Sequence, residues 1–163
     1  MIPAADILLP AADVLVVVPC LNEERTLPAL LDWLRAEVGA ATVVVADGGS
    51  TDASRVIVEA AMQTWPSLHL VANPERYQSA GVNRAVQAFG EGRAWLVRID
   101  AHAAYPQRYV QILIEAALRH GAQSVVVPMV TAGKGCFQRA VAAAQNSKFG
   151  TGGSLHRHIG SGS

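Results

Sequence analysis

Short apolar runs recur along the chain, and residues with helical spacing separate them. The runs that we predict to be strands are Asp13 to Pro19, Thr42 to Asp47, Leu68 to Asn73, Trp95 to Asp100 and Ser124 to Met129. The runs at 43–46 and 125–127 are apolar without a break, which is typical of strands buried on both faces of a sheet. Between the first two runs, leucines recur as on one face of a helix, at Leu27, Leu30, Leu31 and Leu34. This alternation predicts an α/β domain with a mostly parallel sheet.

Capping residues indicate where two of the intervening helices begin. Asn22 and Ser50 are good N-cap residues, and each precedes acidic residues that favour a helix N-terminus. A last helix is predicted over 134–148, and the residues after it are rich in glycine. We therefore expect one domain over 1–149, followed by a flexible tail or an active-site loop over 150–163.

Charge and the lengths of the apolar runs exclude several classes of protein. Thirteen Lys plus Arg balance thirteen Asp plus Glu, and no basic run stands out, so we expect no nucleic-acid partner. The apolar runs are far shorter than the ~20 residues that cross a bilayer, and the N-terminus does not resemble a secretory signal peptide. These features predict a cytoplasmic protein. Cys20 and Cys136 lie far apart and outside any zinc-binding spacing, so we expect both to be reduced packing residues.

Polar residues follow the predicted strands at the edge where parallel α/β sheets bind ligands. One such segment is Asp47-Gly48-Gly49-Ser50-Thr51-Asp52, in which the glycines allow a tight turn and leave Asp47 at the end of its strand. A carboxylate in that position can accept hydrogen bonds from a nucleobase or a ribose. The same residues also suit an ordinary strand–turn–helix connection, so this segment alone does not establish a site.

A second polar segment is Asp100-Ala101-His102. On an extended backbone, side chains two residues apart point to the same side, so Asp100 and His102 are predicted to reach one ion. Carboxylate and imidazole together suit a divalent cation, Mn²⁺ or Mg²⁺, held against a diphosphate. An isolated pair of this kind is more often a solvated aspartate and an unrelated histidine. Arg98 precedes the pair and is expected to bind Asp100, or alternatively to reach the diphosphate.

Three segments carry a more specific pattern when they are taken together. They are Val16-Val17-Val18-Pro19-Cys20-Leu21-Asn22-Glu23, Val45-Ala46-Asp47-Gly48-Gly49-Ser50-Thr51-Asp52 and Asp100-Ala101-His102. In order and spacing they resemble the GT-A glycosyltransferases of family 2. Segments 73–80 and 97–103 further resemble the branch that contains the succinoglycan-biosynthesis glucosyltransferases. The resemblance runs from about Val14 to about Gly153 and implies a GT-A fold, a Rossmann-like and mostly parallel sheet flanked by helices.

The resemblance also implies roles for individual residues. Those that it places around a nucleoside diphosphate are Pro19, Asn22, Glu23, Asp47, Arg76, Asn83 and Asp100. Asp47 would face the base, Arg76 would be a cation for the base or the diphosphate, and Asn83 would lie close to the donor. Asp100 and His102 correspond to the metal-binding D-x-D motif of the family, with His102 in place of the second aspartate.

The activity implied by the resemblance is transfer of a sugar to a growing polysaccharide or a lipid-linked glycan, with inversion at the anomeric carbon. The donor would be a nucleoside diphosphate sugar, with a UDP-sugar preferred. The acidic residue that acts as the base is expected beyond the equivalent of Ser163, so the fold is expected to be truncated on the acceptor side and the catalytic residue stays unknown. Association with the inner face of the cell membrane is expected in the full-length protein only.

Two other functions fit parts of the sequence. A non-catalytic module that binds a nucleotide sugar would follow from the missing acceptor half. A sugar nucleotidyltransferase would need a Gly-rich, basic loop after the first strand, where this chain has Pro19 to Glu23 instead. A P-loop and a dinucleotide-binding fold are excluded, because neither glycine motif occurs.

Overall fold

The computed structural model describes residues 11–127 of the 163-residue chain. In this part, four strands alternate with four helices after a short 3-10 turn at Ala11–Asp13. The strands are β1 (Val14–Cys20), β2 (Thr42–Asp47), β3 (Leu68–Ala72) and β4 (Trp95–Arg98), and the helices are α1 (Leu27–Val38), α2 (Ser54–Met62), α3 (Gln78–Phe89) and α4 (Tyr109–His120). None of these helices is long and apolar enough to span a bilayer.

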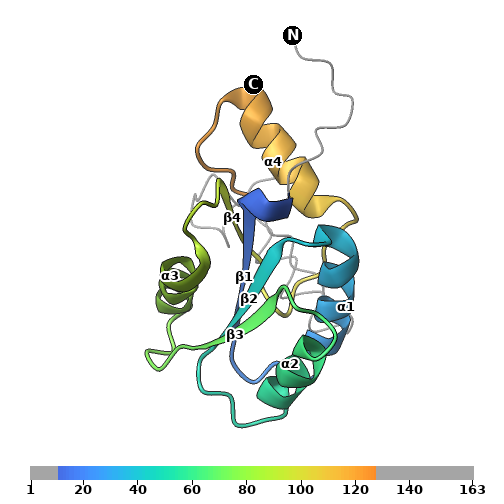
Figure 1. Cartoon of the computed structure of the whole chain (residues 1–163), viewed down its shortest axis with the longest axis vertical. Helices are drawn as coiled ribbons and strands as arrows, with labels where there is room; N and C mark the ends of the chain where they lie inside the picture. Colours follow the sequence, from blue (N-terminus) through green and yellow to red (C-terminus); the bar gives the residue numbers. More distant parts are fainter. Residues whose placement is uncertain (1–10, 128–163) are drawn as a thin grey trace, which may run out of the picture. The chain divides into compact units, whose positions relative to one another are not determined.

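The four strands form one parallel sheet in the order β3-β2-β1-β4 (Figure 1). β1 lies inside the sheet and pairs with β2 from Leu15 to Cys20 and with β4 from Val14 to Val17. The chain builds outward from β1 to β2 and β3, and then returns past β1 to form β4. The order of the strands therefore reverses between β1 and β4, and the predicted parallel α/β sheet is confirmed.

Helices cover both faces of this sheet (Figure 1). On one face, Leu27 and Leu34 of α1 and Val58 of α2 belong to the same buried cluster as the even-numbered valines of β1. On the other face, Ala85 of α3 packs with Leu15 of β1 and other buried residues. Every residue of β1 and β2 is buried, and for β2 the unbroken apolar run at 43–46 predicts this. Two rigid buried strands thus carry the loops that follow them.

The chain divides into two compact units, Met1–Glu115 and Ala116–Ser163, and the boundary falls within α4. The sheet belongs to the first unit, where the start of α4 packs through Val110 and Ile114. All candidate site residues that the sequence identifies also belong to this unit. The predicted domain boundary at residue 149 lies outside the described residues and stays a prediction.

The predicted strand from Ser124 to Met129 is wrong over its described residues. Residues 124–127 have irregular backbone, and residues 128 and 129 lie outside the described part. An apolar run supplies side chains for a sheet, but a strand forms only where its N–H and C=O groups find a neighbouring strand. The predicted helix over 134–148, Cys136 and the tail over 150–163 also lie outside the described residues.

Asn22 and Ser50 do not cap the helices that follow them. Thr26 is the N-cap of α1 and Ala53 is the N-cap of α2, and neither makes a side-chain capping bond. Each helix therefore begins several residues later than the cap pattern predicts. The two predicted caps lie in loops that bind one another, and this places them at the candidate site.

Candidate functional site

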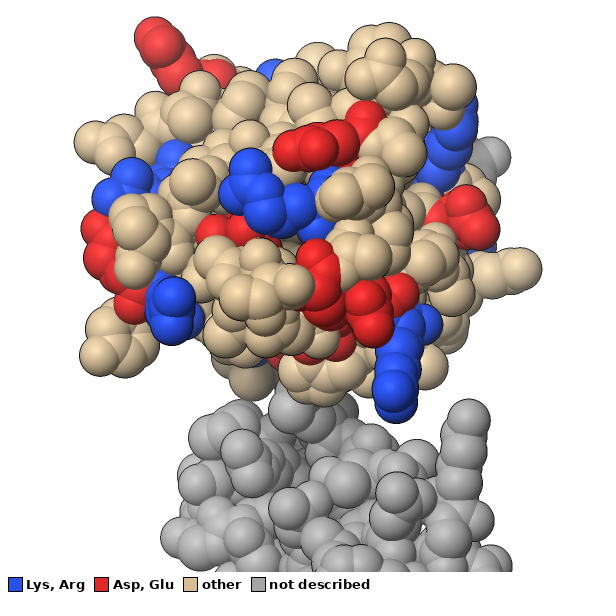
Figure 2. Space-filling view, turned by 90° about the horizontal axis from the view of Figure 1, so that it is seen from below, with Lys and Arg blue, Asp and Glu red and all other residues tan. Residues whose placement is uncertain are grey.

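The loops after β1 and β4 leave the sheet at the point where the strand order reverses. Ligands of open parallel sheets bind outside the carboxyl ends of the strands at such a point. Figure 2 views the molecule from the end at which the strands finish, and acidic and basic side chains lie next to one another on this face. The segments of interest are therefore residues 20–26 after β1, residues 48–53 after β2 and residues 99–108 after β4.

Backbone groups and short polar side chains join the loops after β1 and β2. The backbone N–H of Asn22 donates to Oγ of Ser50 at 2.9 Å, and Oδ1 of Asn22 accepts from the N–H of Thr51 at 2.8 Å. The N–H of Glu23 donates to Oγ of Ser54 at 2.8 Å. Asn22 adopts a positive φ of 55°, a strained conformation that asparagine tolerates and that these bonds maintain. The two loops consequently form one connected structure.

A pair of acids extends this connection. The N–H of Glu24 donates to Oδ2 of Asp52, and the N–H of Ala53 donates to Oε2 of Glu24, both at 3.0 Å. Desolvation raises the pKa of Asp52, but hydrogen bonds from Ser54 and from the backbone outweigh it, so the pKa of this carboxyl is lowered. Both acids therefore have partners within the protein.

Asp47 ends β2 with a side chain that is only 1% exposed. Its Oδ1 and Oδ2 accept the N–H of Ser50 at 3.1 and 3.3 Å, and Nη1 of Arg55 lies 3.2 Å from Oδ2. The carboxylate thus stabilises the turn that carries the two glycines and fixes the start of α2. A contact between Asp47 and a base stays a prediction.

Arg76 lies above the same turn. A Cβ atom at Gly49, which has a φ of +83°, would lie 3.8 Å from Nη2 of Arg76, so the guanidinium covers this glycine. Arg76 itself has a φ of 63° and is exposed. Within residues 11–127, no carboxylate forms an ion pair with Arg76, unlike Arg55 and Arg84. The geometry leaves this cation available to an anion at the carboxyl edge of the sheet.

β4 ends earlier than the sequence predicts, and Pro19 explains where it ends. The last backbone bond between the two strands runs from the N–H of Ile99 to the C=O of Val17. The next bond in a parallel ladder would come from the N–H of residue 19, which proline lacks. Residues 100–103 instead form a turn closed by the N–H of Ala103 and the C=O of Asp100 at 3.3 Å. The prediction that Asp100 and His102 share one side of an extended strand is therefore wrong.

Asp100 is held by its backbone, and one of its carboxylate oxygens has no hydrogen-bond donor within residues 11–127. Its N–H donates to the hydroxyl of Tyr105 at 2.7 Å, and that hydroxyl donates to the C=O of Asp100 at 3.2 Å. Nη2 of Arg98 lies 3.4 Å from Oδ2, which confirms the predicted pairing of Arg98 with Asp100. Oδ1 is buried, and no donor among the described residues is aligned with it, although Nε of Arg98 lies 3.3 Å away. A buried acceptor in this state suits a cation.

His102 is two residues further along the turn and is mostly exposed. Its Nδ1 lies 3.1 Å from Oε1 of Glu23, so a side chain from the β4 turn meets one from the β1 loop. No group of three or more His, Cys, Asp or Glu side chains able to hold a metal occurs within residues 11–127. Asp100 and His102 would accordingly supply few of the ligands of a cation, and a bound diphosphate and water would supply the others.

Two residues of α1 fix the turn after β4, and sequence reasoning missed their part in the site. The ring of Trp33 stacks on Tyr105 with centroids 5.2 Å apart, which places the Tyr105 hydroxyl at the backbone of Asp100. The carboxylate of Glu37 accepts the N–H groups of Arg108 and Val110 at 2.9 and 3.1 Å. The helical leucine pattern locates α1, but no local signal in the sequence joins its polar positions to residues 100–110.

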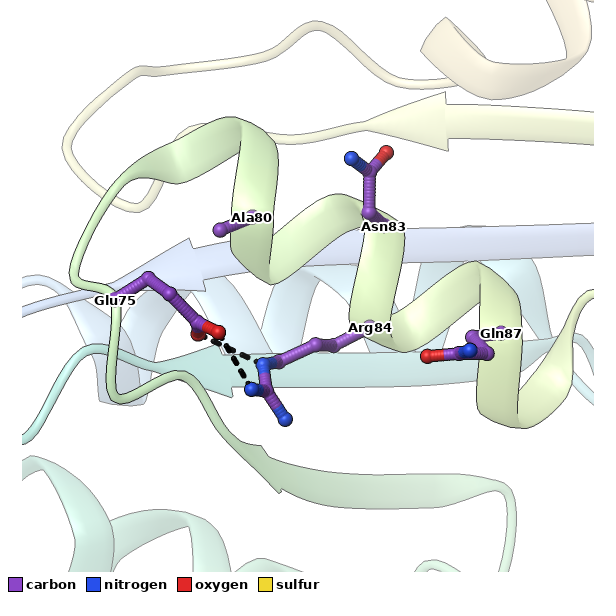
Figure 3. A pocket seen from close by; sticks show the side chains of 5 residues that line it. All are labelled: Glu75, Ala80, Asn83, Arg84 and Gln87. Atoms are coloured by element: carbon purple, nitrogen blue, oxygen red, sulfur yellow. Dashed lines mark hydrogen bonds and ion pairs between the residues drawn. The ribbon is translucent and has the colours of Figure 1, made fainter.

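Asn83 lies apart from these contacts, on the exposed side of α3. It lines a surface hollow of about 280 Å³ together with Glu75, Arg84 and two other residues. Figure 3 shows Asn83 pointing away from Glu75 and Arg84, which form an ion pair with an N–O distance of 2.6 Å. No contact in the described part joins Asn83 to Asp100 or His102, and its role near a donor stays a prediction.

Residues 15–157 match the family model described as Glycosyl transferase family 2. Over 145 residues the chain is 51% identical to the Succinoglycan biosynthesis protein ExoA of Rhizobium meliloti (strain 1021). That match covers 88% of this chain and 44% of the relative.

Two solved structures are similar to the chain over most of its length. The mannosyltransferase PcManGT from Pyrobaculum calidifontis, solved with GDP-Man and Mn²⁺, is 26% identical with a TM-score of 0.53, over 80% of this chain and 38% of that one. The glucosyl-3-phosphoglycerate synthase of Mycobacterium tuberculosis, solved with Mn²⁺, UDP and glucosyl-3-phosphoglycerate, is 20% identical with a TM-score of 0.50, over 71% of this chain and 41% of that one.

The chain thus spans less than half the length of each of these proteins. The match to the family model nevertheless extends over most of the chain, and the parallel sheet is that of GT-A glycosyltransferases. On these findings the chain belongs to glycosyl transferase family 2 and carries a glycosyltransferase domain of the GT-A type.

Proposed function

We propose that this chain binds a nucleoside diphosphate sugar and a divalent cation at the carboxyl ends of β1, β2 and β4. The protein then transfers the sugar to a growing polysaccharide or a lipid-linked glycan, with inversion at the anomeric carbon. A UDP-sugar is the preferred donor. The relative at 51% identity is named for succinoglycan biosynthesis, and two structural neighbours are complexes of Mn²⁺ with GDP-Man or UDP.

The observation that carries this proposal is the state of Asp100. Its Oδ1 is buried without an aligned donor among the described residues, beside the strand reversal where ligands of such sheets bind. The guanidinium of Arg98 lies 3.3 Å from this oxygen without aligning a hydrogen bond to it, and a buried acceptor in this state suits a further cation. His102, two residues away, adds an imidazole nitrogen, and oxygen plus nitrogen donors fit Mn²⁺ or Mg²⁺.

The residues of the site divide the task of holding the donor. Asp100 and His102 would hold the cation, which when bound neutralises the charge that develops on the leaving diphosphate. Arg76 adds a guanidinium above the β2 turn. Asn22 and Asp47 keep the loops after β1 and β2 in a fixed shape against which the base and ribose can bind.

Pro19 and Glu23 lie where the β1 and β4 loops meet and shape that part of the site. Asn83 would approach the donor from α3. Pro19 ends the ladder between the strands, so the backbone turns at Asp100 instead of continuing in the sheet. Asp100 is thereby placed on a loop, where ligand-binding residues are commonly found. The base that deprotonates the acceptor is unassigned.

Donor binding is tested directly by saturation-transfer NMR. The purified chain is mixed with Mg²⁺ and, in turn, with UDP-glucose, GDP-mannose and uridine; Mg²⁺ is used because Mn²⁺ is paramagnetic. We expect at least one of the two sugar nucleotides to receive saturation in a Mg²⁺-dependent manner, and uridine to bind more weakly. Asp100→Asn should lose the Mg²⁺ dependence of donor binding, and Asp32→Asn, which changes an exposed acid on α1, is the matched control. Absence of metal-dependent binding of any donor would remove the proposed function.

Transfer is tested separately. Labelled donor, Mn²⁺ and a lipid-linked acceptor are incubated with the chain, and extension of the glycan is followed. Binding without extension would identify a donor-binding part, as expected from the sequence, and extension would place the base within these 163 residues.

A further inference from the structure

One contact joins the two loops on either side of the strand reversal. Oε1 of Glu23, after β1, lies 3.1 Å from Nδ1 of His102, after β4. The Glu23 side chain is 21% exposed and the His102 side chain is 62% exposed. Glu23 is therefore the more confined partner, and the position of the imidazole follows from it.

Glu23 is fixed by contacts that do not involve His102. Its N–H donates to Oγ of Ser54 at 2.8 Å, and its C=O accepts the N–H groups of Thr26 and Leu27 at 3.0 and 2.9 Å. Its other carboxylate oxygen, Oε2, accepts the hydroxyl of Thr26 at 2.8 Å. The direction in which Oε1 faces is set by this loop.

The chemistry of the contact determines where the proton of His102 resides. A glutamate carboxylate at neutral pH only accepts hydrogen bonds, so the ring nitrogen that faces it must carry hydrogen. A neutral imidazole with hydrogen on Nδ1 has its lone pair on Nε2. Free neutral histidine prefers the opposite tautomer, with hydrogen on Nε2. Glu23 thus selects the form that histidine adopts less readily in water.

We infer that Glu23 is a positioning residue that holds His102 as the Nδ1–H tautomer and presents Nε2 to the cation. This inference rests on the proposed function, because the cation is the one that Asp100 and His102 would hold. Metal-binding histidines commonly donate their other N–H to a carboxylate, which fixes the ring and strengthens the ligand. Glu23 gives this family member, with histidine in place of the second aspartate, a partner that the histidine requires.

The direct test is the tautomer of His102 in the metal-free chain. Long-range ¹H–¹⁵N NMR distinguishes protonated from unprotonated ring nitrogens, and the His102 signal is the one absent from His102→Gln. In the wild type with a neutral ring, we expect Nδ1 to carry the hydrogen. In Glu23→Ala we expect the Nε2–H tautomer to predominate. An unchanged tautomer in Glu23→Ala would overturn the inference, whether or not the chain binds a donor.

Two further variants separate positioning from a general disturbance of the loop. Glu23→Ala keeps the backbone bonds of residue 23 to Ser54, Thr26 and Leu27, so the loop retains its main anchors. Glu23→Gln keeps an acceptor oxygen and should restore part of the Nδ1–H population. Glu24→Ala removes the neighbouring acid, whose side chain contacts Ala53, and should leave the tautomer unchanged.

Cation affinity gives the second readout. With UDP present, we expect Glu23→Ala to weaken Mn²⁺ binding by ~10-fold or more, the usual cost of losing a partner that orients a metal ligand. In a His102→Ala background the same change should have little further effect, because Glu23 acts through the imidazole. An equal loss of Mn²⁺ affinity in the wild-type and His102→Ala backgrounds would show that Glu23 acts on the bound cation or nucleotide without His102, and would overturn the inference. If the wild type binds no Mn²⁺ with UDP, the proposed function fails. The tautomer result still decides whether Glu23 sets the tautomer of His102.

Discussion

The polar groups after β1 and β2 differ from those after β4, although all of them lie at one edge of the sheet. After β1 and β2, side chains such as Asn22 and Asp47 bind backbone N–H groups of the facing loop or of their own turn. After β4, Oδ1 of Asp100 is buried without an aligned donor in the described part, and His102 is exposed with one contact. The polar side chains of the first region find hydrogen-bond partners within the protein, whereas Oδ1 of Asp100 in the second region does not within residues 11–127.

This difference separates residues that shape the site from residues that are available to a ligand. Polar groups that are satisfied within the protein contribute to its stability, and an unsatisfied buried acceptor reduces stability. A family motif names residues of both kinds without distinguishing them. We therefore propose that Asp47 acts mainly on the fold and that Asp100 is available to a ligand.

The largest expected effect concerns Cys20, which ends β1 behind these loops. Burial raises the pKa of its thiol from 9.0 to about 11, and the residue is 5% exposed. At pH 8 the reactive thiolate is therefore ~100-fold scarcer than in the unfolded chain. In a Cys136→Ser background, alkylation by iodoacetamide should be at least ~100-fold slower in the native protein than in urea. Equal rates would show that the region after β1 and β2 opens readily.

The second prediction compares Asp47→Ala with Asp100→Ala. Asp47→Ala leaves the N–H of Ser50 without its acceptor and should lower the free energy of unfolding by about 2 kcal/mol. Asp100→Ala removes a carboxylate that has one oxygen without an aligned donor and an exposed partner. The free energy of unfolding should therefore change by about 0.5 kcal/mol or less. Equilibrium unfolding in guanidinium chloride measures both. A greater loss for Asp100→Ala would reverse the comparison.

A smaller effect is expected for Tyr105→Phe. The change removes the hydroxyl that binds both the N–H and the C=O of Asp100, while it retains the ring that stacks on Trp33. We expect a loss of about 1 kcal/mol in the free energy of unfolding, together with weaker binding of Mn²⁺ with UDP. Tyr109→Phe is the control, because its hydroxyl makes no hydrogen bond within residues 11–127. Identical results for the two variants would exclude a special role for Tyr105.

Much of the fold could be predicted from the sequence because β1 and the middle of β2 are apolar. Their buried runs, the leucine pattern of α1 and the alternation of elements specify a parallel sheet flanked by helices. The run at 124–127 shows the limit of such a pattern, since apolar residues do not by themselves provide a strand to pair with.

The candidate site was predicted less completely, for reasons of geometry. The motifs locate Asp100 and His102, but the turn that holds them depends on Pro19 of another strand. Likewise, Asn22 and Ser50 are residue types that favour helix N-caps, yet the N–H of Asn22 donates to the hydroxyl of Ser50 between two loops. Contacts between distant segments decide each case, and a local pattern contains no information about them.

The most direct test of the account is the gain in UDP affinity that Mn²⁺ provides, measured by calorimetry with and without the cation. We predict a clear gain in the wild type and in Asp47→Ala, even where Asp47→Ala binds uridine less well. In Asp100→Ala the gain should fall by ~10-fold or more, because the carboxylate oxygen that lacks a donor is lost. A full Mn²⁺-dependent gain in Asp100→Ala would contradict the assignment of the ligand-binding part of the site to the turn after β4.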